Sequence, residues 1–267
     1  MPILRLNDID IYFERAGHGP PVLFISGTGG DLRVKPNVFD GPLPRQFDTI
    51  AYDQRGLGRT SKPDRPFTME QYAGDAASLL AALGVPRALV FGVSFGGMVA
   101  QELAIRHPDR VRAMVLACTS PGGAGGASYP LHTLSGMTRP EVARHMIPIS
   151  DTRRDANWAA AHPEEFKALI DLGANDPYVD EPDRAIGARR QLEARAAHDT
   201  WDRLGAIRCP VLIAGGKFDG IARPEVQARM AQRIPRAELR MFDGGHLFLL
   251  QDRSAFPAIL EFLAASW

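Results

Sequence analysis

The stretch that most constrains the fold is residues 88–103, where an apolar β-type run passes directly into a helical pattern at Ser94. Glycine stands two positions before and two positions after this serine, at Gly92 and Gly96. A direct change from strand to helix needs a tight backbone turn and neighbours without side chains, which glycine supplies. The turn holds one hydroxyl at a helix N-terminus, where the helix dipole favours developing negative charge. The pattern G-x-S-x-G therefore makes Ser94 a candidate nucleophile.

Apolar runs and helical patterns alternate along the chain on both sides of this turn. The predicted strands are an edge hairpin strand at 9–13, apolar runs at 22–25, 49–52, 88–93, 111–117 and 210–214, and a last strand at 237–242. A capping box at Thr68 and Gln71 starts a helix between two of these runs, and further helical patterns follow residues 94, 224 and 256. Fully apolar strands alternating with helices are typical of a doubly wound, mostly parallel α/β sheet.

The alternation stops between residues 121 and 200, where no buried strand is predicted. The glycine-rich stretch 120–128 has the composition of a flexible hinge. Helices are predicted after the capping box Thr138-x-x-Glu141, from Pro163, and over the charged stretch 183–197. We therefore predict a core of residues 1–120 and 201–267 and an inserted helical lid of residues 121–200.

The composition excludes several classes of partner. Lys plus Arg and Asp plus Glu are equal at 31 each, so the chain has no basic excess for nucleic acid or an anionic membrane. No apolar run reaches bilayer length, and the N-terminus has no signal-peptide core. Cys118 and Cys209 are expected at opposite ends of the sheet, too far apart for a disulfide. These features predict a cytoplasmic protein, monomeric or homodimeric, that acts on a small molecule without a metal or other cofactor.

A serine nucleophile needs a base, and the base needs an acid that orients it. Asp219 and His246 each follow a predicted strand, so their loops should open at the same sheet edge as Ser94. The chain order Ser…Asp…His fits a hydrolase built on such a turn. Asp53 and Asp243 are the alternative acids, but Asp53 is better suited to hydrogen bonds within its own loop. Asp243 lies so close to His246 in sequence that it should face the turn.

The other six histidines are predicted to be solvated surface residues. They are His18, His107, His132, His145, His162 and His198.

The tetrahedral intermediate of acyl transfer needs two preorganised N–H donors, each worth about 3–4 kcal/mol of barrier lowering. The backbone N–H of Phe95 is one candidate, because it directly follows the nucleophile. The second is expected from the loop after residue 25, with Thr28 as the first candidate. In the same loop, Arg33 and Lys35 are open to two interpretations, as receptors for an acidic substrate or as solvated cations.

A substrate pocket is predicted between the lid and the core. Alternatively, the candidate side chains from the lid do not contact substrate and only pack the lid onto the core. The candidate pocket residues are Gly27, Gly29, Tyr129, Leu134, Met137, Met146, Trp158, Phe166 and Leu247.

These motifs together resemble the α/β-hydrolase fold superfamily over essentially the whole chain. The resemblance is carried by Gly92-x-Ser94-x-Gly96, the run Asp-Gln-Arg-Gly-Leu-Gly at 53–58, Gly216-x-x-Asp219 and Gly245-His246. Within the superfamily, the chain is similar to a lid-bearing group of 3-oxoadipate enol-lactonases, carboxylesterases, C–C bond hydrolases and cofactor-free haloperoxidases.

The resemblance implies an eight-stranded sheet and assigns a role to each motif residue. Ser94 matches the nucleophile, Asp219 the acid and His246 the base, and Phe95 and Thr28 match the oxyanion donors.

At three positions, the sequence can be compared with patterns that distinguish the enzymes of this superfamily. Ser26 and Gly27 stand where the family often has His-Gly, which could shift the second oxyanion donor by one residue. Leu247 replaces the tryptophan that often follows the catalytic histidine of C–C hydrolases. The dehalogenases and epoxide hydrolases of this fold use an aspartate nucleophile, and Ser94 argues against both.

The sequence therefore predicts a serine hydrolase that cleaves an ester or lactone of a small, largely apolar substrate through an acyl-enzyme. The alternatives are a C–C bond hydrolase, a cofactor-free perhydrolase or haloperoxidase, and a receptor that binds a small molecule without turnover.

Overall fold

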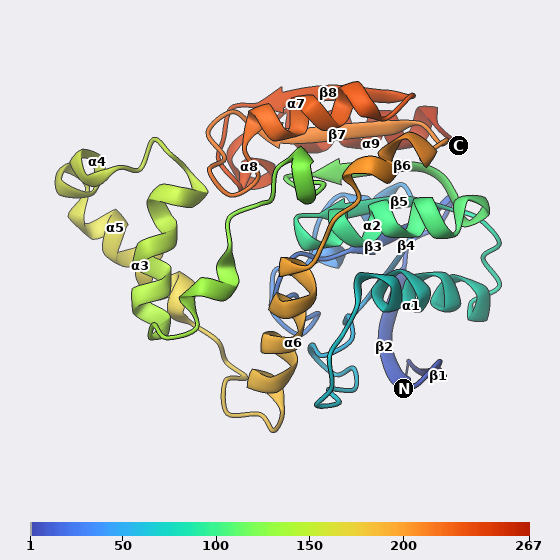
Figure 1. Ribbon diagram of the computed structural model, residues 1–267, viewed down its shortest axis with the longest axis horizontal. Helices are drawn as coiled ribbons and strands as arrows, with labels where there is room; N and C mark the ends of the chain where they lie inside the picture. Colours follow the sequence, from blue (N-terminus) through green and yellow to red (C-terminus); the bar gives the residue numbers. More distant parts are fainter. Residues whose placement is uncertain (1) are drawn as a thin grey trace.

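The predicted apolar strands assemble into one eight-stranded sheet (Figure 1). The computed structural model describes residues 2–267. The strands are β1 (Ile3–Leu6), β2 (Ile9–Ala16), β3 (Pro21–Ile25), β4 (Asp48–Tyr52), β5 (Ala88–Val93), β6 (Val111–Ala117), β7 (Val211–Gly216) and β8 (Ala237–Phe242). Their order across the sheet is β1-β2-β4-β3-β5-β6-β7-β8. The pairs from β4 to β8 are parallel, and β2 runs antiparallel to both of its neighbours, so the mostly parallel sheet is confirmed.

One detail of the sheet edge differs from the prediction. The strand that begins at Ile9 is not the edge, because β1 pairs outside it in an antiparallel hairpin. β1 is only four residues long and half exposed, so its apolar pattern is too short to predict from sequence.

Helices cover both faces of the sheet and form two apolar cores. The helices are α1 (Met69–Ala82), α2 (Phe95–Arg106), α3 (Arg139–Ser150), α4 (Ala156–Ala161), α5 (Pro163–Ala174), α6 (Arg184–Ala196), α7 (Pro224–Arg233), α8 (Phe248–Gln251) and α9 (Ala255–Ala265). Strand side chains alternate between the faces: Val90 packs with residues of α1, α2 and α7, whereas Leu89 and Phe91 pack with residues of α8 and α9. Burying each such side chain stabilises the fold by about 1.5–3 kcal/mol.

Helices α3 to α6 lie in the insertion between β6 and β7. Figure 1 shows α3, α4 and α5 beside the sheet, at the side where the parallel strands end. Helix α3 packs on α5 through Ala143, Ile147 and Ile170, which form a small apolar cluster of their own. The insertion therefore has its own packing in addition to its contacts with the core.

The glycine-rich stretch 120–128 is packed more tightly than an open hinge requires. Ser120 and Pro121 are buried, and Thr200 donates its N–H to the carbonyl of Pro121 at 2.8 Å. Gly122 pairs with Asp199 in an antiparallel bridge. The entry and exit of the insertion are thus hydrogen-bonded to each other.

Among residues 2–267, no helix is both long and apolar enough to cross a bilayer. The same residues hold no group of three His, Cys, Asp or Glu side chains arranged to bind a metal ion. Cys118 and Cys209 are both buried and free.

Candidate active site

Ser94 occupies a strained backbone position between β5 and α2. Its φ of 54° and ψ of −114° lie in a region that residues with a side chain rarely adopt. Two hydrogen bonds hold the turn: the Ser94 N–H donates to the carbonyl of Ala117 at 2.8 Å, and the Gly97 N–H donates to the carbonyl of Ser94 at 2.9 Å. The predicted sharp turn is therefore present.

The two glycines of the motif are required by close backbone contacts. A Cβ on Gly92 would lie 2.4 Å from the carbonyl oxygen of Gly96. A Cβ on Gly96 would lie 2.0 Å from the carbonyl oxygen of Ile25, at the end of β3. Any side chain at either position would push α2 away from the sheet and displace Ser94.

A hydrogen-bonded chain joins the three residues that the sequence placed at separate strand ends. The Nε2 atom of His246 lies 3.0 Å from the Oγ atom of Ser94, and its Nδ1 atom lies 2.8 Å from Oδ2 of Asp219. A carboxylate only accepts hydrogen bonds, so the His246 proton belongs on Nδ1. The lone pair of Nε2 then faces the serine hydroxyl, as a general base requires.

The second carboxylate oxygen of Asp219 is fixed by its own loop. It accepts the N–H groups of Ile221 at 2.8 Å and Ala222 at 2.9 Å, and the residue is buried. Both oxygens are thus engaged, so the carboxylate cannot rotate away from His246.

The other two candidate acids lie elsewhere. Asp243 has a largely exposed side chain and pairs with Arg153 at 3.7 Å. Asp53 is buried and accepts the N–H groups of Leu32 at 2.8 Å and Arg59 at 2.9 Å, which are the loop hydrogen bonds expected of it. Burial raises the pKa of Asp53 to about 6, against the lowering effect of these two N–H donors.

The end of α3 supports the loops of the acid and the base, which the sequence did not reveal. The carbonyl of Ile149 accepts the N–H of Gly220 at 3.0 Å, and the carbonyl of Ser150 accepts the N–H of His246 at 2.6 Å. The last carbonyls of a helix have no partner within the helix and need one outside it. The insertion therefore contributes directly to the position of His246.

The two candidate oxyanion donors come from different segments that both adjoin Ser94. Phe95 begins α2, and a Cβ on Gly27, next to Thr28, would lie 3.5 Å from the Cβ of Ser94. Within residues 2–267, neither the Phe95 nor the Thr28 N–H has a hydrogen-bond acceptor. The N–H of Gly29 is instead taken by the side chain of Gln191 in α6 at 2.9 Å.

A cavity of about 910 Å³ adjoins this site between the sheet edge and the insertion. Ser94 does not itself line it, but Val93 and His246 do, and so does Thr28, the candidate oxyanion donor. Gly29 and Leu247, two of the candidate pocket residues, also line it. Its outer rim carries apolar side chains that are open to solvent, among them Leu250 at 80% exposure. The cavity therefore suits a ligand with a substantial apolar part.

The insertion side chains predicted to line this cavity do not do so. They are Tyr129, Leu134, Met137, Met146, Trp158 and Phe166, and Gly27 is also absent from the lining. Trp158 and Phe166 pack against the cluster between α3 and α5, and the hydroxyl of Tyr129 contacts Nε2 of His145 at 2.7 Å. The insertion's own cluster thus accounts for Trp158 and Phe166, whereas Met137 is 44% exposed and contributes to neither the cluster nor the cavity.

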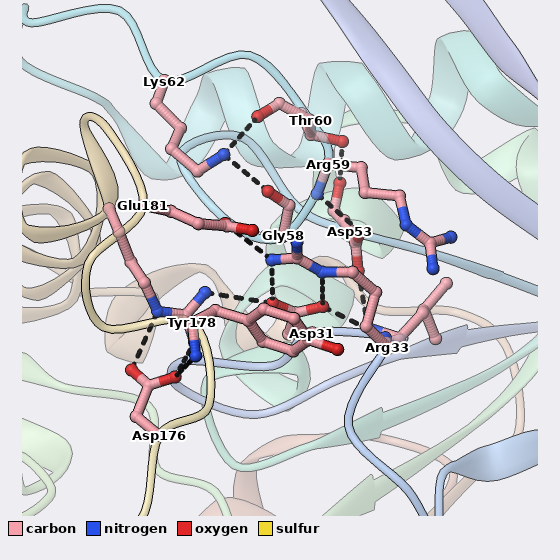
Figure 2. A network of polar contacts seen from close by, with 12 residues as sticks. Asp31, Arg33, Asp53, Gly58, Arg59, Thr60, Lys62, Asp176, Tyr178 and Glu181 are labelled. Carbon is pink, nitrogen blue, oxygen red and sulfur yellow. Dashed lines mark hydrogen bonds and ion pairs between the residues drawn. The ribbon is translucent and has the colours of Figure 1, made fainter.

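The insertion lines the cavity instead through the segment between α5 and α6, which is tied to the loop after β3 (Figure 2). The buried carboxylate of Asp31 accepts from Arg33 at 2.7 Å and from Arg184 at 3.0 Å. Arg184 also binds Asp176 at 2.8 Å, and Arg33 binds Glu181. Burial alone would raise the pKa of Asp31, but the two arginines outweigh it and lower that pKa to about 2.

This network changes the interpretation of the two cations near the loop. Arg33 is neither solvated nor free, because its guanidinium is held by Asp31 and Glu181 and stacks 3.7 Å from the ring centre of Tyr178. Lys35 is exposed and pairs with Asp40 at 3.2 Å.

Comparison with known proteins places the chain in a family. A model of the α/β-hydrolase fold matches residues 20–142. The poly(3-hydroxyalkanoate) depolymerase of Ectopseudomonas oleovorans is 31% identical over 256 residues, which cover 92% of this chain and 85% of that protein. The 3-oxoadipate enol-lactonase 2 of Acinetobacter baylyi is 24% identical over 98% of this chain and 97% of that protein. The crystal structure of the enol-lactonase from Burkholderia xenovorans LB400 has a TM-score of 0.79 at 26% identity, covering 98% of this chain and 100% of that one.

A strained serine at the end of a parallel strand, next to a histidine and an aspartate from later strand ends, defines a class of hydrolytic site. The fold and the relatives agree with this class. The chain belongs to the α/β-hydrolase fold family, and the depolymerase and lactonases among its relatives support hydrolase activity.

Proposed function

We propose that this protein is a serine hydrolase that cleaves a carboxylic ester or lactone of a largely apolar substrate through an acyl-enzyme. The observation that carries the proposal is the position of His246, which bridges the hydroxyl of Ser94 at 3.0 Å and the carboxylate of Asp219 at 2.8 Å. A lactonase and a polyester depolymerase among the relatives support this choice of bond.

In the first step, Nε2 of His246 takes the proton of Ser94 as its oxygen attacks the substrate carbonyl. Asp219 keeps the imidazole in the required tautomer and stabilises its positive charge. The negative charge on the carbonyl oxygen is received by the N–H groups of Phe95 and Thr28, at about 3–4 kcal/mol for each donor. His246 then protonates the leaving alcohol.

In the second step, His246 takes a proton from water as the water oxygen attacks the acyl carbonyl. His246 then returns that proton to the oxygen of Ser94 as the acyl–oxygen bond breaks, which restores the hydroxyl and releases the carboxylic acid. The apolar rim of the cavity supports a substrate whose acyl or alcohol part is a hydrocarbon chain. In this proposal, the insertion acts as a lid that excludes bulk water from the acyl-enzyme.

The test is turnover of p-nitrophenyl butyrate by the wild type and by Ser94→Ala. We expect steady multiple turnover by the wild type and a fall in kcat of about 10⁶-fold in the variant, with an unchanged unfolding midpoint. Stoichiometric release of nitrophenol that then stops would favour a receptor that binds without turnover. Turnover by folded Ser94→Ala at the wild-type rate would end the proposal.

A panel of short esters, lactones and diketones, assayed with the same two proteins, separates ester or lactone cleavage from C–C bond cleavage. The proposal expects the highest kcat/KM for an ester or a lactone.

A further inference from the structure

A second, smaller cavity of about 60 Å³ lies where the insertion leaves and rejoins the core. Its wall includes Met98 of α2, Ser120 at the entry of the insertion, and Arg195 and His198 at the end of α6. Among the described residues it shares no lining residue with the larger cavity beside His246. It is therefore a separate site.

Arg195 is a buried cation without a carboxylate partner. It is only 5% exposed, and its Nη1 and Nη2 donate to the carbonyl of Tyr129 at 2.7 Å and the hydroxyl of Ser128 at 2.5 Å. Its Nε–H has no acceptor within residues 2–267. Burial lowers the pKa of Arg195 to about 10, so the group remains charged at neutral pH. A buried charge is normally paired, because leaving water without a counter-charge is costly.

Two further polar side chains of the same cavity are without partners. His198 is 5% exposed and Ser120 is fully buried. Within residues 2–267, the hydroxyl of Ser120 has no hydrogen-bond partner, and the ring nitrogens of His198 make no well-directed hydrogen bond, although the ring lies close to the backbone of Ser120. The prediction that His198 is a solvated surface residue is therefore wrong. Burial lowers the pKa of His198 to about 4, which leaves a neutral ring with one N–H to donate.

Nearby carboxylates are already engaged and do not neutralise Arg195. Glu102 lies near His198 but binds Arg106 at 2.9 Å and Arg203 at 2.5 Å. Asp199 accepts the N–H of Trp201 at 3.0 Å. The cavity thus combines one uncompensated positive charge with donors from a guanidinium, a hydroxyl and an imidazole.

We propose that this cavity binds a small monovalent anion, of the size of chloride or formate, against Arg195 with hydrogen bonds from Ser120 and His198. A cation would be repelled by the guanidinium, and water would leave its charge uncompensated. The volume limits the ligand, because one water occupies about 30 Å³ in the liquid and drug-sized ligands need about 300 Å³ or more.

The location gives the anion a structural consequence. The segment from Ser120 to Tyr129 begins the insertion, and Arg195 and His198 end it. An anion held between these two segments links the two ends of the insertion to each other. Because it binds the folded chain only, it raises the unfolding free energy by RT ln(1 + c/Kd), where c is the anion concentration, so thermal stability rises once that concentration exceeds the dissociation constant.

The experiment measures melting temperature against sodium bromide, with sodium formate as a second arm and sodium gluconate keeping the ionic strength constant. Bromide replaces chloride at similar size, and gluconate is too large for the cavity. We expect little change below the dissociation constant and a rise of about 5–10 °C at a hundred-fold excess over it. The concentration at which each arm begins to raise the melting temperature tells whether a halide or a carboxylate is preferred. Crystals soaked in bromide should show its anomalous signal beside the Nε of Arg195.

Three variants separate this site from a general salt effect. Arg195→Met should lose the anion-specific rise in melting temperature, and Ser120→Ala should shift the onset of that rise to an anion concentration about ten-fold higher. Arg189→Met is the matched control, because Arg189 lies in the same helix but is exposed and pairs with Asp64 at 3.2 Å, so it should respond like the wild type.

An unchanged bromide response in Arg195→Met would overturn the proposal, and so would water in place of bromide in the cavity. A bromide signal without an anion-specific rise in melting temperature would mean an adventitious ion only and would also overturn it. If Arg195→Met does not fold, the shifted onset of the rise in Ser120→Ala and the bromide signal decide the question. Ester turnover is not part of the readout, so failure here is distinct from failure of the proposed hydrolase function.

Discussion

Replacing Asp219 by asparagine tests the proposed role of the acid with little change in shape. One oxygen of Asp219 accepts the N–H groups of Ile221 at 2.8 Å and Ala222 at 2.9 Å, and the other accepts from Nδ1 of His246. In Asp219→Asn, the amide oxygen must keep the two backbone donors, because an NH₂ group there would face two N–H groups. The NH₂ group therefore faces His246 and forces the proton from Nδ1 to Nε2.

With its proton on Nε2, His246 donates a hydrogen bond to Ser94 and cannot accept the serine proton. We expect kcat to fall by about 10⁴-fold, which corresponds to about 5.5 kcal/mol of barrier. The residual rate should still exceed that of Ser94→Ala. The assay is steady-state hydrolysis of p-nitrophenyl butyrate, with urea unfolding to confirm the fold.

The matched control is Asp243→Asn. Asp243 lies three residues before His246, but its side chain is 65% exposed and, within residues 2–267, its only ion pair is at 3.7 Å. A surface pair of this kind contributes at most about 1 kcal/mol, so kcat should stay within about two-fold of the wild type. If folded Asp219→Asn kept more than a tenth of the wild-type kcat, the tautomer argument would be refuted.

Two further predictions concern stability and substrate length. Burial raises the pKa of Asp53 from 3.8 to about 6, so the native state binds this proton more tightly than the unfolded state does. As pH rises from about 4 to above 6, the unfolding free energy therefore falls by about 3 kcal/mol. Asp53→Asn should lack this loss, so its stability relative to the wild type should rise between pH 4 and 7 in urea unfolding. If the difference in unfolding free energy between Asp53→Asn and the wild type stayed constant with pH, the raised pKa of Asp53 would be contradicted. Leu250→Ser should lower kcat/KM for p-nitrophenyl octanoate about five-fold, because about 1 kcal/mol of apolar contact with the long acyl chain is lost at the rim. The kcat/KM for p-nitrophenyl acetate should be unchanged. Leu172→Ser is the control, since Leu172 is 73% exposed but does not line the cavity, and an equal loss in both variants would rule out a rim contact.

The sequence determined the sheet and the reactive centre because both depend on local patterns. Continuous apolar runs can be buried only as central parallel strands, and parallel strands bring their carboxyl ends to one edge. Ser94, Asp219 and His246 follow the parallel strands β5, β7 and β8 within four residues, so their proximity follows from topology. The glycines at 92 and 96 carry an equally local signal, since the turn cannot close around a larger residue.

Only the tertiary structure decided what surrounds that centre. The carbonyls of Ile149 and Ser150 support the loops of the acid and the base, and a backbone carbonyl leaves no mark in a side-chain pattern. Trp158 and Phe166 have the apolar character of pocket residues, but the insertion buries them in its own cluster. The burial of His198 depends on the exit of the insertion meeting its entry, 78 residues earlier, at Ser120. Such contacts join segments far apart in the chain, and hydrophobic periodicity reports only the neighbours within one element.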